Sequence, residues 1–351
     1  MNILRQFLQI LRRPPRTAVP VHQPPTAPDH LTASSQLSTH DPKGRARLAL
    51  LARFTKPSEL APPDIKQEWL ARLGVPYDNV IRAFVSSRFL RQTTLTEQAN
   101  LLLVPDLKRL LKQAGLKVSG TKPELIDRLS QQAYDQLAPA LRPLPDRYVC
   151  TDAGGAEARR YTDEFAAREL QAKRASFDAL QSGKPDLACR LKSDLDAWSP
   201  YHHSNPLAVS DSPLDLLTTI LRLDLPPAIA PPPGAALACR LKAAAAWQSL
   251  WGRLDDALEL AGVDAPVTVR YENDIVLNQI ESQAICHMEL ERYRASPDII
   301  SAVEIMGAED SCPACERLAK RSFRLPDVPA LPYHRCTNDM GCRCCYAPVV
   351  R

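Results

Sequence analysis

The sequence has 351 residues, of which 45% are hydrophobic and 24% are charged, a balance typical of a folded globular protein. It holds 32 prolines but only 12 glycines, and 6% of its residues are aromatic, which favours small helical units over a large β core. No run of about 18 apolar residues occurs, so the sequence excludes a conventional membrane-spanning helix.

The N-terminal region, residues 1–43, is predicted to be a basic helix followed by a proline-rich disordered tether. Residues 1–54 carry eight Lys/Arg against two Asp/Glu. No small-residue cleavage site follows the first apolar residues, so we expect a cytoplasmic protein, associated with the nucleoid if it is bacterial. One face of the predicted helix is apolar and either packs on the protein itself or docks on a membrane surface; it consists of Ile3, Leu4, Phe7, Leu8 and Leu11.

A helical region is predicted over residues 44–100, and a two-helix module over residues 101–135. Pro105 and Asp106 favour the start of the first helix of this module, and Gly115 favours its end in a left-handed cap. Thr121 and Glu124 have the spacing of a capping box that opens the second helix. The two helices would bury apolar faces formed by Leu107, Leu110, Leu111, Leu125, Ile126 and Leu129.

The same module is basic, because residues 101–132 carry six Lys/Arg against three Asp/Glu. The N-terminus of its second helix is expected to present free N–H groups beside Gly120 and Lys122. Such an arrangement suits a phosphate group. The module therefore favours contact with a polyanion over a purely structural role.

This segment resembles the SAP domain, a small helix–extended–helix module that binds DNA; the matching residues include Leu107, Lys108, Leu110, Gly115, Leu116, Val118, Lys122, Leu125, Ile126 and Leu129. The family usually has a Ser or Thr cap on the first helix where this chain has Leu103, so one phosphate-contacting hydroxyl is missing. A module that mediates only protein contact is the alternative. The resemblance implies contacts with DNA, or with RNA, from Lys108, Lys112, Lys117, Ser119, Gly120, Thr121, Lys122 and Arg128.

A second helical region is predicted over residues 147–300, and it is acidic: residues 133–311 carry 17 Lys/Arg against 27 Asp/Glu. It contains no phosphate-cradling glycine loop, no nucleophile elbow and no zinc-protease helix, so we assign no catalytic function to it. We expect this region to act as a spacer and as a surface for a protein partner.

The last 40 residues hold six of the ten cysteines, and we predict a Cys-rich module over residues 301–351. Cys312 and Cys315 have the two-residue gap of a zinc knuckle, and thiolates are the ligands that tetrahedral zinc prefers. A redox pair, disulfides and an iron–sulfur cluster remain as alternatives, and His334 and Cys345 as further ligands. Our predicted ligands for a structural zinc ion are Cys312, Cys315, Cys336, Cys342 and Cys344.

The predicted fold is mainly α and multi-domain: a SAP-like module, a helical middle and a small zinc-stabilised α+β module. The leading functional hypothesis is a DNA-binding protein that tethers a partner to DNA. In it the basic Cys-rich module at the C-terminus adds a second contact or binds a protein partner. The second is a structural or assembly protein of phage or mobile-element origin, because the Cys-Arg-Cys ending over residues 342–344 resembles that of phage head-morphogenesis proteins. The third is a nuclease or other metalloenzyme, which would require an open metal position.

Overall fold

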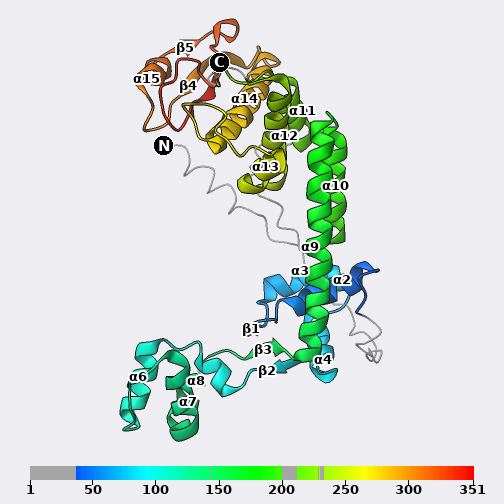
Figure 1. Cartoon of the computed structure of the whole chain (residues 1–351), viewed down its shortest axis with the longest axis vertical. Coiled ribbons are helices and arrows are strands. Elements are labelled where there is room, and N and C mark those ends of the chain that lie inside the picture. Colours follow the sequence, from blue (N-terminus) through cyan, green and yellow to red (C-terminus); the bar gives the residue numbers. More distant parts are fainter. Residues whose placement is uncertain (1–36, 143, 200–211, 228, 230–232) are drawn as a thin grey trace.

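The described residues of this computed structural model are 37–142, 144–199, 212–227, 229 and 233–351. Within them the protein is mainly helical with two small antiparallel sheets, which confirms the predicted fold class. Figure 1 shows two bodies at the ends of one long helix and a smaller unit that projects to the side. No helix in these ranges has both the length and the apolar character needed to cross a bilayer. The predicted N-terminal helix and most of the predicted tether lie outside the described residues.

The N-terminal body packs α2 (Pro42–Ala52), α3 (Pro63–Leu73) and α4 (Tyr77–Ser86) beside the first turns of α9 (Asp152–Gln181). Asp41 caps α2 by accepting a hydrogen bond from the backbone N–H of Gly44 at 2.8 Å. Apolar side chains from all of these helices bury one core, which includes Leu50, Phe54, Trp69, Phe84 and Tyr161.

A three-stranded antiparallel sheet, in the order β1 (Ser58–Glu59), β3 (Arg147–Cys150), β2 (Leu90–Gln92), adjoins this body. In the β2–β3 pair, residue 90 lies opposite residue 150 and residue 92 opposite residue 148. The intervening chain leaves the sheet on β2 and returns on β3, its neighbour. Residues 93–146 are therefore an insertion carried on a two-stranded stalk (Figure 1).

The insertion contains four helices: α5 (Leu95–Ala99), α6 (Val104–Gln113), α7 (Lys122–Gln132) and α8 (Tyr134–Leu141). The predicted pair of helices corresponds to α6 and α7, and the structure adds α5 and α8 on either side. All four contribute to one apolar core that is separate from the core of the N-terminal body; it includes Ala99, Leu107, Leu111, Leu125, Leu129 and Leu137.

The long helix α9 has 30 residues, which corresponds to about 45 Å at 1.5 Å per residue. Its side chains Ala158 and Tyr161 belong to the N-terminal core, whereas Phe177 and Leu180 belong to the core of the second body. It packs against α10 (Pro185–Trp198) as a helical hairpin. The helix thus joins the two bodies through both of its ends (Figure 1).

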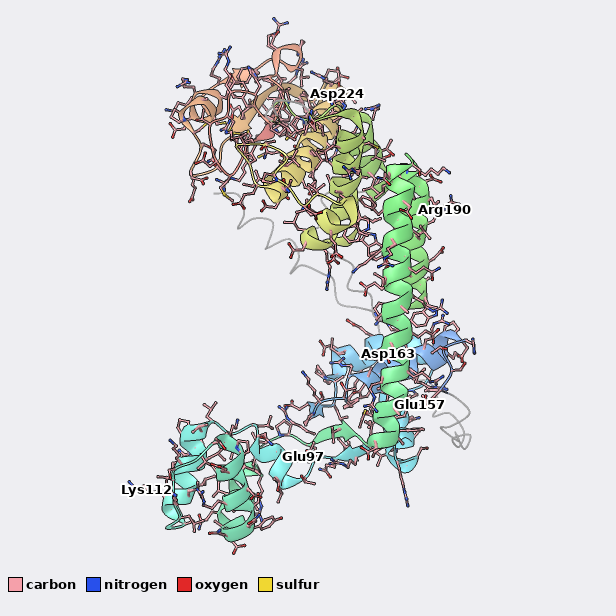
Figure 2. The ribbon with its side chains drawn as sticks, viewed as in Figure 1. Glu97, Lys112, Glu157, Asp163, Arg190 and Asp224 are labelled. Atoms are coloured by element: carbon pink, nitrogen blue, oxygen red, sulfur yellow. The ribbon has the colours of Figure 1, made fainter. Side chains whose placement is uncertain are left out.

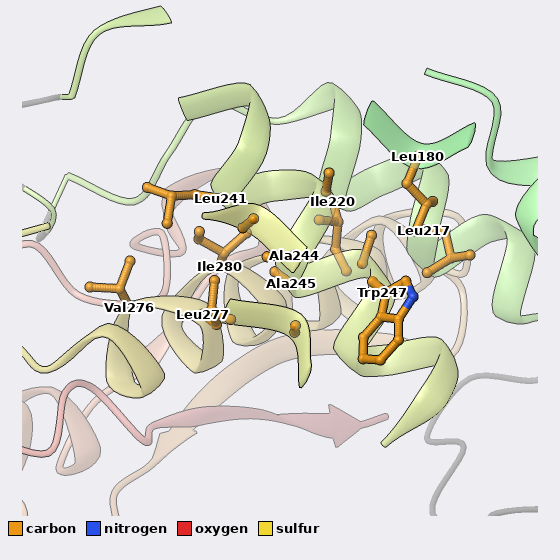
Figure 3. Close-up of a cluster of buried hydrophobic side chains, with 14 of the residues drawn as sticks. Leu180, Leu217, Ile220, Leu241, Ala244, Ala245, Trp247, Val276, Leu277 and Ile280 are labelled. Carbon is orange, nitrogen blue, oxygen red and sulfur yellow. The ribbon is translucent and has the colours of Figure 1, made fainter. Parts of the chain in front are cut away.

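In the second body, α12 (Ala235–Trp251) is the central helix. It contacts α11 (Pro213–Arg222), α13 (Leu254–Ala261) and α14 (Asn273–Arg294). The alanines at positions 243–246 are fully buried, and their small side chains let neighbouring helices approach α12 closely. Trp247 is also fully buried in this cluster (Figure 3). Its indole N–H donates to the carbonyl of Lys173 in α9 at 2.9 Å.

The chain ends in a small α+β unit, as predicted. Its antiparallel sheet has β4 (Ile300–Met306) between β5 (Ser322–Phe323) and β6 (Cys345–Val350), and α15 (Pro313–Ala319) and a 3₁₀ turn, η2 (Leu325–Asp327), lie between β4 and β6 in the chain. The end of α14 contributes Cys286 and Leu290 to the core of this unit. The Cys-rich module is therefore continuous with the second body through α14.

Candidate nucleic-acid interface and metal centre

Helix α6 forms as the sequence predicts. Pro105 and Asp106 occupy its first turn, and Gly115 follows its C-terminus with a φ of +69°, the left-handed conformation expected of a cap. Leu103 is the N-cap residue; it makes no side-chain hydrogen bond and is 67% exposed. The hydroxyl that SAP domains usually place here is thus replaced by an exposed apolar side chain.

Three of the predicted DNA contacts are exposed lysines. Lys108 and Lys112 lie on α6, and Lys117 lies in the extended link between α6 and α7. Figure 2 shows Lys112 at the outer edge of the module, away from the stalk. Among the described residues none of the three has an acidic partner, whereas Arg109 is paired with Asp106 at 2.8 Å. Their charges are therefore available to an anionic ligand.

Two other predicted contacts point to backbone carbonyls inside the module. Nη1 of Arg128 donates to the carbonyls of Lys117 at 2.5 Å and Ser119 at 3.1 Å. Nζ of Lys122 donates to the carbonyl of Asn100 at 2.7 Å. Both cations hold segments of the module in place, with Arg128 fixing the path of the extended link. Lysine and arginine at these positions thus shape the surface as well as contribute charge to it.

The N-terminus of α7 differs from the expectation in one respect. The capping box is present, and in it the carboxylate of Glu124 accepts a hydrogen bond from the backbone N–H of Thr121 at 2.8 Å. Gly120 has a φ of +134°, and a Cβ there would lie 2.6 Å from Oε2 of Glu124. The N–H of Thr121 is therefore not free for a phosphate, because the helix's own carboxylate accepts its hydrogen bond. Ser119, Gly120 and Thr121 nevertheless remain exposed.

The structure brings all five predicted metal ligands together. Their sulfurs form two groups, each with all sulfurs within 4.8 Å of one another, and Cys315 belongs to both. Every one of the five side chains is buried. The two groups are Cys312, Cys315 and Cys336, and Cys315, Cys342 and Cys344.

The sulfur spacing fits a tetrahedral metal ion. The sulfurs of Cys312 and Cys336 are 3.9 Å apart, and those of Cys315 and Cys342 are 4.0 Å apart. Zinc–sulfur bonds of about 2.3 Å place the corners of a tetrahedron about 3.8 Å apart. A cavity of about 10 Å³ lies beside the sulfurs, and the cysteines that line it are Cys312, Cys315, Cys336 and Cys344. Four of the five cysteines thus line a space of atomic size.

The local electrostatics place a thiolate in each of the two groups. Burial raises the pKa of Cys312, but hydrogen bonds from the backbone N–H groups of Thr337 and Cys315 outweigh it and lower the pKa to about 6. A hydrogen bond from Cys344 lowers the pKa of Cys342 to about 5. Burial raises the pKa of Cys315, and the hydrogen bond with Cys342 raises that of Cys344. The thiolate is the form of cysteine that binds metal.

The loop that carries Cys342 is held by a residue from the second body. The buried side chain of Gln279, on α14, donates from Nε2 to the carbonyl of Cys342 at 3.1 Å and accepts from its N–H at 3.1 Å. Gly341 has a φ of +78°, and a Cβ there would lie 2.4 Å from Nε2 of Gln279, so the clamp requires glycine. Sequence reasoning missed Gln279, since nothing marks one glutamine in a long helix as the partner of a loop 63 residues away.

Two further candidates from the sequence lie outside the cluster. His334 is exposed, stacks edge-on against Tyr333 and is not part of either sulfur group. Cys345 begins β6, is half-buried and belongs to neither group. The candidate centre is therefore built from sulfur alone.

Comparison with known proteins identifies one part of the chain. The family model of the SAP domain matches residues 99–132, from the end of α5 to the end of α7. No curated protein and no solved structure matches the chain. The matched segment contains the extended link, the exposed lysines and most of the separate apolar core described above. The two-helix unit of the inserted module is thus a SAP domain.

Proposed function

We propose that this protein binds nucleic acid, and DNA in particular, through its SAP domain. The observation that carries the proposal is that the family match falls on a module with three exposed lysines that have no acidic partner among the described residues. The SAP match itself supports nucleic-acid association. Lys108, Lys112 and Lys117 would contact phosphates, and the exposed backbone at Ser119 and Gly120 would lie against the same strand.

The contact reads the phosphate backbone rather than the bases. Lysine ammonium groups are point charges that attract phosphates without matching a base edge. Arg128 and Lys122 already donate hydrogen bonds to backbone carbonyls of the module, so they act as positioning residues. With three free cations, the logarithm of the binding constant should fall by about 2.7 for each tenfold rise in salt.

We also propose a tethering role. The SAP domain sits at the end of a stalk and has its own core, so it can contact DNA while the rest of the chain stays clear of the duplex (Figure 1). The acidic helical middle would repel DNA and remain available to a protein partner. This division of charge supports a protein that holds a partner near DNA.

For the sulfur cluster we propose a structural zinc ion. Two overlapping groups of buried sulfurs, with pairs 3.9 and 4.0 Å apart, can supply the four ligands of a tetrahedral site and favour zinc or another thiophilic ion over ions that need oxygen ligands. A catalytic site would need an open position for water or substrate, and burial of all five sulfurs favours a closed one. The ion would hold α15, the loop around residues 336–344 and the start of β6 together.

The binding proposal is tested by fluorescence anisotropy with a labelled duplex over a range of salt concentrations. Replacement of Lys108, Lys112 and Lys117 by glutamine should weaken binding and reduce the salt slope by about 2.7, since about three phosphate contacts are lost. The matched control replaces Lys43, Lys56 and Lys184, which are exposed and outside the module. Equal binding by the two triple variants, or no binding by the native chain, would contradict the proposal.

A further inference from the structure

We propose that an arginine-lined groove on the Cys-rich module is a second binding site for the nucleic-acid backbone; this inference rests on the proposed function and extends it to the other end of the molecule. The groove has a volume of about 670 Å³, which is much larger than a single inorganic ion requires and is sufficient for a nucleotide unit. Arg317, Arg321 and Arg335 line it together with Pro313, Ala314, Leu318, Tyr333 and Thr337.

The three arginines are uncompensated cations of this module, as are Lys320 and Arg351. Each is exposed, and none has an acidic partner within the described ranges. By contrast, Arg324 lies 3.9 Å from Asp327, and Arg343 is paired with Asp310. Residues 312–351 carry seven Lys/Arg against three Asp/Glu, and three of the seven cations line the groove, where none of the described lining residues is Asp or Glu.

The chemistry of the groove fits phosphodiesters. A guanidinium group presents a planar set of donors that can bind two phosphate oxygens at once. The ring of Phe323 lies 5.0 Å from the guanidinium of Arg321 and restrains its orientation. Tyr333 adds a half-buried aromatic wall, and cations next to an aromatic surface are the usual composition of grooves that hold nucleic-acid strands.

The groove lies far from the SAP domain, so one chain would have two separate binding sites for nucleic acid. The Cys-rich module and the SAP domain lie at opposite ends of the molecule (Figure 1). Helix α9, about 45 Å long, runs between the two bodies that carry them. One chain can therefore contact two separate segments of nucleic acid, or two distant points on one long duplex. Binding at the first site raises the effective concentration at the second, so long DNA should bind more tightly than the sum of short contacts suggests.

The metal centre would hold the groove in shape. Arg317 lies on α15, the helix that contains Cys315, and Arg335 directly precedes Cys336. The same proximity allows a different role, in which the arginines only balance the charge of the thiolates. The two roles differ in what is lost when the arginines are replaced: DNA contacts in the first, metal in the second.

The test uses the full chain with Arg317, Arg321 and Arg335 replaced by glutamine, and a duplex long enough to reach both sites. We expect the salt slope of DNA binding to be about 2.7 smaller in this variant than in the native chain. The variant's loss of affinity between about 50 and 200 mM salt should therefore be about 40-fold smaller than that of the native chain. A triple lysine replacement at the same positions should keep the slope, since the charges remain. The control variant replaces Arg53, Arg82 and Arg174, which are exposed and lie on other elements. Metal content is measured on every variant.

The outcomes separate this inference from the proposed function. If the arginine variant binds with an unchanged slope while the SAP lysine variant is impaired, the groove is not a nucleic-acid site and the SAP proposal stands. If only the arginine variant is impaired, the groove proposal stands and the SAP proposal is wrong. Should the arginine variant lose its metal, Arg321→Gln alone decides, since Arg321 lies beyond α15 and away from the cysteines; an unchanged slope then overturns the groove proposal.

Discussion

The SAP domain and the Cys-rich module are both small units, and different kinds of core stabilise them. The inserted module that contains the SAP domain buries leucine, isoleucine and alanine side chains from four helices that follow one another within about 50 residues of chain. The core of the Cys-rich module instead includes six cysteines, Cys286 among them, and draws on α14 and on strands at both ends of the unit. The first is a local apolar core, and the second is a non-local core in which sulfur replaces much of the hydrocarbon.

The difference predicts how each unit responds to damage. A core of apolar side chains loses stability in proportion to the volume removed. A unit held by a closed metal site loses most of its stability in one step, because removal of one ligand opens the coordination sphere and releases the ion. The stalk should keep the two responses independent, since helices α5–α8 pack against one another around their own core and Glu97 is paired with Arg91 on β2.

The largest effect is expected for Cys315→Ser, since Cys315 belongs to both sulfur groups. Elemental analysis should find one zinc ion per native chain and none in the variant, with a loss on the order of 10 kcal/mol of binding free energy. Hydrogen exchange should show loss of protection in residues 300–351 but not in the SAP domain. Cys345→Ser is the control and should retain the metal. A variant that kept its zinc would contradict the assignment of Cys315.

Leu107→Ala should produce the opposite pattern. Leu107 is fully buried in the SAP core, and its truncation should cost about 2–5 kcal/mol of stability. Hydrogen exchange should rise in α5–α8, DNA affinity should fall, and the zinc content should stay at one per chain. Leu103→Ala removes a side chain that is 67% exposed and should change stability little. Equal destabilisation by both substitutions would contradict the local core described above.

A smaller effect is expected for Gln279→Leu, which removes the clamp on the loop of Cys342. The buried N–H and carbonyl of Cys342 would each lose a hydrogen bond, at a cost of about 1–3 kcal/mol for an unsatisfied group. Competition with a chelator should therefore show weaker metal retention. Gln283→Leu, on the same helix, is the control. Metal retention equal to that of the native chain would show that the cluster is held without the second body.

The smallest effect concerns the joint between the stalk and the SAP domain. A hydrogen-bonded ion pair with Arg91, on β2, lowers the pKa of Glu97, on α5, to about 2. Since this pKa lies below the unfolded value, the pair contributes stability that is fully present above about pH 4.5 and is lost as the pH falls toward 2. A titration followed by NMR should find the low pKa in the native chain and a higher one in Arg91→Gln. A native pKa near 4.5 would mean that the pair does not form in solution.

The comparison also explains what the sequence could predict. The helices, caps and buried faces of the SAP domain depend on residues a few positions apart, and these predictions are confirmed for α6, α7 and Gly115. The grouping of five cysteines was predictable from their spacing and chemistry. The stalk, the clamp from Gln279 and the arginine groove depend on contacts between distant segments, which spacing does not reveal. The carboxylate of Glu124 at the expected phosphate seat shows that a correctly predicted cap can still alter a predicted site.

The most direct test of nucleic-acid binding uses the antiparallel stalk itself. The backbone N–H of Thr93 donates to the carbonyl of Arg147 at 2.9 Å, so an Asn-Gly turn can join these two residues in place of residues 94–146 and remove the whole inserted module. The shortened chain should keep its zinc and the helices that lie outside the deleted module. Our account predicts that its salt slope for duplex DNA falls by about 2.7 relative to the native chain. Duplex binding with an unchanged affinity and slope would contradict the claim that the SAP domain binds DNA.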